Sequence, residues 1–318
     1  MINNLDRKLV ASVRRYGEAH GYTITTHSHD WIISLSRDGR SHHVFGYDLG
    51  LNASTTHRLC NDKAATFEVL DAHGIPAIPH RLFLHPRWLD FVALDGNWRG
   101  LIAAFEEAGG DAVLKDNEGT GGREVLRARS ERELEQAATT IWQTARSLAL
   151  SPYRDIRVEL RFILLDGAPQ LAYAKDRPAI IGNGTETVAE LVRKLALPDG
   201  VNGEIIEEVA RIHPATHVPD DGEIITVQWR HNLGKGATPR RLDVGDPEIA
   251  DALDLARAAA ARTGLRFGSV DIAVLEDETA VLEINSGVML EHLSDAAGND
   301  GDRLVDGIYH AVLERALG

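Results

Sequence analysis

Two apolar runs near the C-terminus decide the fold: Val270-Asp271-Ile272-Ala273-Val274 and Ala280-Val281-Leu282-Glu283-Ile284-Asn285. The polar turn Glu276-Asp277-Glu278 between them predicts a hairpin. Glu283 and Asn285 are two positions apart, so their side chains share one strand face, which Asp271 can join across the hairpin. Two carboxylates and an amide oxygen are hard ligands suited to Mg²⁺. A solvated strand face is the alternative for Glu283 and Asn285, but an unpaired carboxylate in so apolar a run is costly, which favours function for Asp271.

Cationic residues upstream lie beside turns and glycine-rich segments. Lys115 ends the short strand that begins at Ala112 and precedes a glycine-rich turn, 118–122, whose backbone N–H groups could approach phosphate oxygens. Arg161, Lys175 and Arg177 flank the hairpin turn Asp166-Gly167, and a second glycine-rich segment covers 230–237. Taken singly, each segment is also explained as an ordinary turn, a charged surface or a mobile loop.

The mixture of elements indicates α+β lobes, because hairpins outnumber regular βαβ units. We expect three parts: a small N-terminal α/β unit (1–53), a first lobe with the glycine-rich turn (54–149) and a second lobe with the metal site (150–318). The expected helices cover 5–19, 54–74, 130–148, 187–195, 246–264 and 303–317, with Ser151-Pro152 breaking the third. Short strands are expected at 22–25, 31–35, 42–45, 112–115, 124–126, 156–165, 170–174 and 223–229, besides the C-terminal pair.

Composition excludes several classes of protein. The 318 residues include 34 Lys+Arg and 48 Asp+Glu, a formal net charge of −14, which disfavours nucleic-acid binding because that binding needs cations against phosphate. The single cysteine, Cys60, allows neither an internal disulfide nor a cysteine-rich zinc site. No run is long and apolar enough to span a membrane, and the N-terminus lacks a signal-peptide pattern, so we expect a cytoplasmic protein.

The order of these segments resembles the ATP-grasp superfamily over about residues 54–318. It is closest in style to its amino-acid ligases, such as the cyanophycin synthetases and the ligases that add glutamate to protein termini. The matching pieces are 61–66 with Gly74-Ile75-Pro76, 113–115 with 119–122, 159–161 with Arg177-Pro178 and 182–184, 232–236, and 270–272 with 282–286. The resemblance implies two lobes that clamp ATP, with Mg²⁺ as cofactor, two ions expected, for which Mn²⁺ could substitute.

The resemblance also implies roles for individual residues. Arg161, Arg230 and Lys235 would be catalytic, with Arg161 facing the transferred phosphate. Nucleotide binding would involve Lys63, Lys115, Lys175, Arg177, the lid residues Gly119, Thr120, Gly121 and Gly122, and Asp155 as the candidate near the ribose, with adenine near 148–153. Metal binding would fall to Asp271, Glu283 and Asn285, and substrate binding to Asn232, Gly236, Ser286, Gly287, Glu291 and His292. The family often has Pro-Gly after the Glu-x-Asn motif, whereas this chain has Ser286-Gly287, so the identity of the acceptor does not carry over.

The expected activity is ligation of a carboxylate to an amine through an acyl phosphate, giving ADP and phosphate. The partners would be small-molecule carboxylate and amine substrates, such as amino acids or peptides, and neither a nucleic acid nor a membrane. Because the N-terminal unit is short, a second subunit of a homo-oligomer could complete the substrate pocket. Two alternatives remain: a kinase of the same fold that phosphorylates a hydroxyl, and a non-catalytic ATP-binding module.

Overall fold

The computed structural model describes residues 7–89, 97–119, 121, 124–195, 197 and 201–318, and the chain divides into two compact units. The first unit comprises residues 1–172 and 242–318, and the second comprises residues 173–241. The expected partition into 1–53, 54–149 and 150–318 stays a prediction. None of the helices in the described ranges has the length and apolar character needed to cross a membrane.

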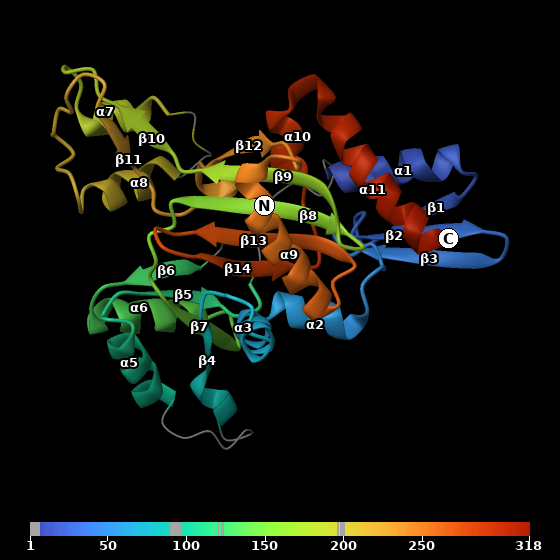
Figure 1. Cartoon of the computed structure of the whole chain (residues 1–318), viewed down its shortest axis with the longest axis horizontal. Coiled ribbons are helices and arrows are strands. Elements are labelled where there is room, and N and C mark those ends of the chain that lie inside the picture. Colours follow the sequence, from blue (N-terminus) through green and yellow to red (C-terminus); the bar gives the residue numbers. More distant parts are fainter. Residues whose placement is uncertain (1–6, 90–96, 120, 122–123, 196, 198–200) are drawn as a thin grey trace. The chain divides into compact units, whose positions relative to one another are not determined.

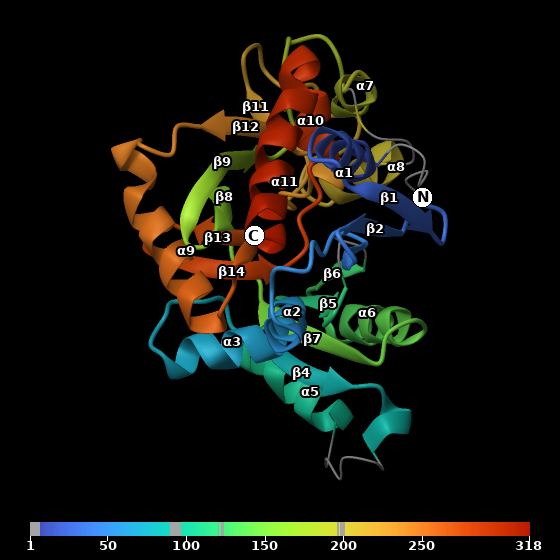
Figure 2. The ribbon, with the colours of Figure 1, turned by 90° about the vertical axis from the view of Figure 1, so that its right-hand side faces the viewer.

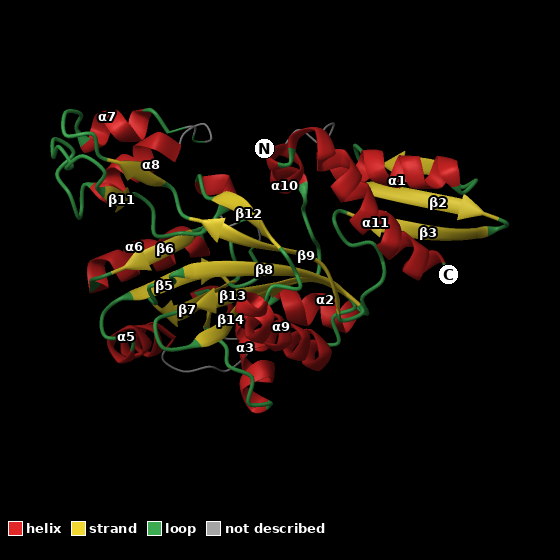
Figure 3. Cartoon of the chain, turned by 45° about the horizontal axis from the view of Figure 1, so that its top comes forward, coloured by secondary structure: helices red, strands yellow, loops and turns green. Residues whose placement is uncertain are grey.

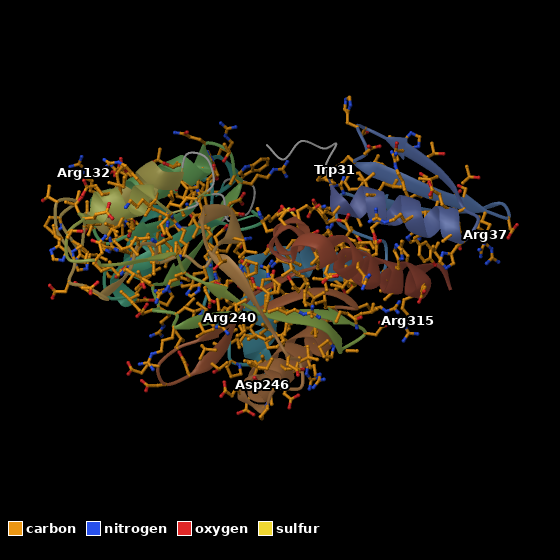
Figure 4. The ribbon with its side chains drawn as sticks, turned by 90° about the horizontal axis from the view of Figure 1, so that it is seen from above. Trp31, Arg37, Arg132, Arg240, Asp246 and Arg315 are labelled. Atoms are coloured by element: carbon orange, nitrogen blue, oxygen red, sulfur yellow. The ribbon has the colours of Figure 1, made fainter. Side chains whose placement is uncertain are left out.

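The N-terminal residues of the first unit form a helix and a three-stranded antiparallel sheet in the order β1-β2-β3. The bounds of these elements are α1 (Lys8–Ala19), β1 (Thr23–His27), β2 (Ile32–Arg37) and β3 (Arg40–Phe45). The expected helix and strands are thereby confirmed. Helix α1 packs against the C-terminal helix α11 (Gly301–Leu317), and Figure 2 shows the two side by side. Arg15 pairs with Asp306 across them at 2.7 and 2.8 Å. Trp31 and Arg37 mark opposite ends of β2 in Figure 4.

A four-stranded antiparallel sheet in the order β4-β7-β5-β6 follows, with bounds β4 (Arg81–Leu84), β5 (Ala112–Asp116), β6 (Val125–Ala128) and β7 (Ser147–Pro152). A 3₁₀ turn (Pro86–Trp88) and two helices complete it, α5 (Asn97–Glu107) and α6 (Glu131–Trp142). Both helices pack on the sheet, and Leu101, Leu114, Leu134 and Leu148 belong to the core between them (Figure 1).

The expected helix 130–148 is wrong in its second half. Helix α6 ends at Trp142, and residues 147–152 form β7, which lies between β4 and β5. A strand buried on both faces reads as a continuous apolar run, which periodicity alone cannot separate from a buried helix. Pro152 is tolerated because it stands at the end of the strand.

A third sheet includes neighbouring strands in the order β9-β8-β13-β14. Their bounds are β8 (Val158–Leu165), β9 (Ala168–Asp176), β13 (Phe267–Val274) and β14 (Thr279–Asn285). The predicted hairpin turn Asp166-Gly167 joins β8 to β9, and both residues have positive φ, 48° and 78°. Three helices pack on this sheet: α2 (Ser54–Asn61), α3 (Lys63–Ala72) and α9 (Ala250–Thr263), which follows a 3₁₀ turn (Pro247–Ile249) (Figure 2). The short helix α10 (Glu291–Ala296) and a 3₁₀ turn (Gly298–Asp300) lead into α11.

The expected single helix 54–74 is two helices. Asp62 leaves the helical region, with φ −97° and ψ 111°, and its side chain accepts a hydrogen bond from the Ala65 N–H. This is an N-cap, in which an aspartate satisfies a free donor at the start of a new helix. Lys63 therefore becomes the first residue of α3 rather than part of a longer helix.

The second unit begins within β9, beside which β12 (Thr238–Leu242) pairs. Its other elements are β10 (Ala179–Ile181), antiparallel to β11 (Ile224–Thr226), α7 (Val188–Arg193), α8 (Val201–Val209) and a 3₁₀ turn (Leu233–Lys235) (Figure 3). Thr187 and Glu190 form a capping box at the start of α7. The expected strand 223–229 is thus shorter, only 224–226, and Val188, Val192, Ile205 and Ile225 belong to the core of this unit.

Candidate functional site

Three charged side chains stand side by side across β8, β13 and β14 of the first unit. Asp271 lies directly opposite Arg161 on one neighbouring strand and opposite Glu283 on the other. Directly opposite residues of antiparallel strands point to the same face. The guanidinium of Arg161 donates to both oxygens of Asp271, with Nε–Oδ1 and Nη2–Oδ2 distances of 2.5 Å, and Nη2 lies 3.7 Å from Glu283 Oε1. The expected hairpin and the shared face of Asp271 and Glu283 are confirmed.

A β-bulge in β14 produces this register. Ile272 pairs with Val281 and Asp271 pairs with Glu283, so Leu282 is the extra residue. Continued without the bulge, the pairing from the turn would place Leu282 opposite Asp271. The bulge instead places a carboxylate there, in keeping with the tendency of bulges to redirect side chains at functional positions.

The side chains at this face have the donor chemistry of a Mg²⁺ site. Asn285 lies two positions beyond Glu283 and donates from Nδ2 to Glu283 Oε1 at 3.2 Å, so the three predicted ligands are adjacent. Carboxylate and amide oxygens are the ligands Mg²⁺ prefers. Asp271 is fully buried, and Arg161 holds both of its oxygens. No cluster of three His, Cys, Asp or Glu residues within the described ranges is arranged to hold a metal ion, so the Asn285 oxygen would have to complete the set.

Lys115 is the penultimate residue of β5 and is almost entirely buried, at 9% exposure. Its Nζ lies 3.4 Å from Nε2 of His80. Burial lowers the pKa of the Lys115 ammonium, and the nearby charge of Lys63 adds to this, whereas Glu283, Glu159 and Asp271 act in the opposite direction. Lys115 is therefore within electrostatic range of the acidic pair on β13 and β14.

Lys63 joins the first turn of α3 to the glycine-rich turn. Its Nζ donates to the carbonyl oxygens of Asp116, Asn117 and Gly119 at 3.1, 3.4 and 2.7 Å. The Ala64 N–H donates to Asn117 Oδ1 at 3.1 Å. Gly119 is required here, because a Cβ at this position would lie 2.7 Å from the Cβ of Asp116. The structure brings Lys63 and Gly119 together as expected, whereas Thr120 and Gly122 lie outside the described residues.

A separate group of predicted site residues belongs to the second unit: Lys175, Arg177, Arg230, Asn232, Lys235 and Gly236. The guanidinium of Arg230 lies over the Trp229 ring, 4.8 Å from its centroid, and burial lowers its pKa. Lys235 forms an ion pair with Glu204 at 2.8 Å. Gly236 has φ +99°, and a Cβ there would lie 2.5 Å from Leu197, so the loop requires glycine at this point.

The residues expected to face the acceptor follow β14. Ser286 is buried and its hydroxyl lies 2.8 Å from His57 Nδ1, while Gly287 packs against Tyr47. Glu291, also buried, accepts from the Tyr47 hydroxyl at 2.8 Å and from the Lys8 N–H at 3.2 Å. These contacts tie the segment to the N-terminal residues.

The remaining predicted site residues are Gly121, His292 and Asp155. Gly121 lies between β5 and β6 with a positive φ of 72°, His292 lies in α10, and Asp155 lies between β7 and β8. All of the predicted site residues keep their assigned roles as predictions.

Sequence reasoning missed His80, which follows Pro79 and directly precedes β4. It also gave no role to Glu159, which is buried two residues before Arg161. Nothing in the sequence distinguishes His80 from the other histidines, because its contact with Lys115 joins positions 35 residues apart. The period of two already places Glu159 on the same strand face as Arg161, but this placement alone assigns it no role.

Comparison with known proteins shows similarity to ATP-grasp ligases, although no protein-family model matches the chain. The cyanophycin synthetases of Trichormus variabilis and a Nostoc species are 28% and 29% identical over 255 residues, covering 73% of this chain and 26% of each relative. The chain thus aligns with about a quarter of the length of these relatives.

Solved structures show the same relationship. A bifunctional glutathione synthetase from Pasteurella multocida matches with a TM-score of 0.52 and 15% identity, covering 89% of this chain and 40% of that one. The D-alanine–D-alanine ligase of Bacillus anthracis matches with a TM-score of 0.53 and 14% identity, covering 84% and 72%. At this identity the likeness shows the fold, which is that of the ATP-grasp ligases, and the expected fold class is confirmed.

Proposed function

We propose that this chain, which has the ATP-grasp fold, is an ATP-dependent ligase that joins a carboxylate to an amine. The observation that carries the proposal is the row formed by Arg161, Asp271 and Glu283, with the buried Lys115 within electrostatic range. The row combines hard oxygen ligands with cations suited to a transferred phosphate. The names of the relatives, which include cyanophycin and glutathione synthetases, support amide bond formation.

The proposed reaction has two steps that balance without any further reactant. An oxygen of the substrate carboxylate forms a bond to the γ-phosphorus of ATP, and the bond from that phosphorus to the β–γ bridging oxygen breaks, which releases ADP. The amine nitrogen then bonds to the acyl carbon, phosphate leaves with the electron pair of the C–O bond, and the nitrogen loses a proton. The protein contributes mainly positioning and charge stabilisation.

Different side chains of the first unit would bind the phosphates and the metal. Lys115 would bind phosphate oxygens, Lys63 would do so after exchanging a carbonyl oxygen of the turn for a phosphate oxygen, and Arg161 would face the transferred phosphate. Asp271, Glu283 and Asn285 would hold Mg²⁺, for which we propose two ions, and bound Mg²⁺ supplies neutralisation of the β- and γ-phosphates. Arg161 holds both oxygens of Asp271, so it would have to release that carboxylate for Asp271 to serve as a metal ligand.

The residues of the second unit and those after β14 would serve the substrates. We propose that Arg230, Asn232 and Lys235 bind the substrate carboxylate or the acyl phosphate, and that Lys235 then exchanges its partner Glu204 for this anion. The substrates would be amino acids or peptides, in line with the names of the D-alanine–D-alanine ligase and the glutathione synthetase. Ser286 and Glu291 would act by shaping the acceptor pocket, because both are buried and hydrogen-bonded to the N-terminal part of the chain.

The test is a screen for ADP release over pairs of carboxylates and amines, with mass spectrometry of the product. We expect ADP release that requires both substrates and a product lighter than their sum by one water. Glu283→Gln and Asp271→Asn should nearly abolish turnover in a folded protein, and Arg157→Gln, an exposed position on the same unit, is the matched control. Near-wild-type turnover in Glu283→Gln would reject the metal assignment.

The same screen separates the alternatives. A kinase would release ADP without an amine and give a product heavier by a phosphoryl group. A non-catalytic module would bind ATP and release no ADP with any pair. Either result would replace the ligase proposal.

A further inference from the structure

His80 is a buried histidine in contact with the lysine of the proposed phosphate site. Its side chain is 3% exposed, and its two ring nitrogens have different partners. Nδ1 lies 2.9 Å from the carbonyl oxygen of Ile78, and Nε2 lies 3.4 Å from Nζ of Lys115. His80 also lines a small pocket together with Lys63 and Glu283, so the imidazole adjoins the other charged groups of the site.

These two contacts determine the tautomer of His80. A carbonyl oxygen can only accept a hydrogen bond, so Nδ1 must carry a proton and donate it to Ile78. Nε2 of the neutral ring then has a free lone pair, which can accept from the ammonium of Lys115. Burial, reinforced by the charges of Lys115 and Lys63, holds the pKa of His80 well below its usual range, while the Ile78 carbonyl opposes the shift. The ring is therefore neutral at pH 7.

The two lysines of the site differ in how their ammonium hydrogens are used. Lys63 directs its three N–H groups at three carbonyl oxygens of the turn at 116–119. For Lys115, His80 is the hydrogen-bond acceptor among the residues that the structure describes, which leaves two N–H groups for an anion. Lys115 is thus the lysine prepared to receive a phosphate oxygen, and His80 is the group that orients it.

We propose that His80 is a positioning residue, whose neutral imidazole holds the Lys115 ammonium so that its remaining N–H groups point at the nucleotide phosphates. The inference deepens the proposed function and rests on it. His80 acts through Lys115 and does not itself touch the nucleotide. Losing the acceptor that orients Lys115 should weaken nucleotide binding about tenfold, which corresponds to about 1.4 kcal/mol.

The first experiment measures MgADP affinity by calorimetry in His80→Leu, which keeps much of the buried volume and removes the acceptor. We expect a loss of about tenfold, and His80→Gln, whose amide oxygen can accept, should recover to within about threefold of wild type. His73→Gln is the matched control, because His73 also hydrogen-bonds a backbone carbonyl but is exposed, and its affinity should be unchanged. Wild-type affinity in His80→Leu would overturn the inference.

A double-mutant cycle separates positioning from a general structural effect. In a Lys115→Met background, His80→Leu should cause no further loss of MgADP affinity, because the group that His80 orients is gone. An equal loss in both backgrounds would show that His80 acts on the fold alone, and it would overturn the inference. If Lys115→Met abolishes binding while His80→Leu binds as wild type does, the proposed function stands and the inference fails.

A measurement on the unmodified protein covers the case in which His80→Leu does not fold. Nitrogen NMR distinguishes the two neutral tautomers and the imidazolium, and we expect His80 to carry its proton on Nδ1 at pH 7. A proton on Nε2, or on both nitrogens, would overturn the inference. If the wild-type protein binds no MgADP while His80 shows the expected tautomer, the proposed function fails and the role toward nucleotide fails with it.

Discussion

The ion pair of Arg161 with Asp271 allows a sharp test of how the site is built. Asp271 is fully buried, and Arg161 is 18% exposed. Replacing Arg161 with Met keeps the length of the side chain and removes the charge, which leaves a buried carboxylate without its cation. Breaking a buried pair by removing one partner costs about 3–5 kcal/mol. We expect the lower end, about 3 kcal/mol, because Glu283 is 28% exposed and admits water to one side.

Magnesium should reverse part of this loss. On the proposed metal assignment, Mg²⁺ would have to displace the guanidinium that holds both oxygens of Asp271 in the wild type, whereas Arg161→Met has no guanidinium to displace. A ligand that binds only the folded state stabilises it in proportion to its affinity. Mg²⁺ should therefore raise the free energy of unfolding more in Arg161→Met than in the wild type, by at least about 1 kcal/mol.

The assay is urea unfolding followed by tryptophan fluorescence, with EDTA or with millimolar Mg²⁺. Arg157→Met is the control, because Arg157 pairs with Glu276 at 2.6 Å with both side chains more than half exposed. Exposed pairs contribute about 0–1 kcal/mol, so this variant should unfold nearly as the wild type does. If Arg161→Met loses no more than Arg157→Met, or if Mg²⁺ stabilises the wild type and Arg161→Met equally, the reasoning from the buried pair is refuted.

Three further predictions concern other parts of the first unit. Burial raises the pKa of the Cys60 thiol to about 11, so a thiol reagent at pH 8 should label it only after unfolding, and rapid labelling of the native protein would contradict this. Arg266 lowers the pKa of Asp166 mainly by hydrogen bonding, so their pair stabilises the fold above about pH 4 and the effect is lost as the pH falls through the lowered value. Asp166→Asn, which suits the positive φ of the turn, should cost less than about 1 kcal/mol at pH 7 and less still at pH 2, as measured by urea unfolding at both values. Gly264→Ala should cost about 1 kcal/mol in the same assay, because this residue ends α9 with φ +73°, and an unchanged midpoint would contradict the capping role.

The parts of the fold that the sequence predicts well are those that local chemistry determines. Asp166-Gly167 predicts its hairpin because both residues tolerate positive φ, and the run 270–285 predicts its hairpin through two apolar strands around a polar turn. Strand β7 was missed because a strand covered on both sides has no period of two. The break at Asp62 was missed because an aspartate within a helical pattern is also compatible with an exposed helix position.

The same difference between local and long-range determinants applies to the candidate site. The adjacency of Glu283 and Asn285 follows from a local period of two, and it could be read directly from the sequence. The pairing of Arg161 with Asp271 depends on the register between strands 110 residues apart, which no local pattern sets. The contact of His80 with Lys115 depends on how β4 and β5 come together around β7, so it appears only in the folded chain.

The charge balance of the site constrains how the nucleotide must arrive. The candidate site has as many positive as negative side chains when all of them are ionised. The positive ones are Lys63, Lys115 and Arg161, and the negative ones are Glu159, Asp271 and Glu283. A site without excess positive charge does not attract a free triphosphate, and its carboxylates would repel one. On the proposed function, Asp271 and Glu283 would hold a metal ion whose positive charge offsets their repulsion of the phosphates, and Arg161 would then face the phosphates. On this proposal, the bound metal would supply the positive charge that allows a chain with a net charge of −14 to hold ATP.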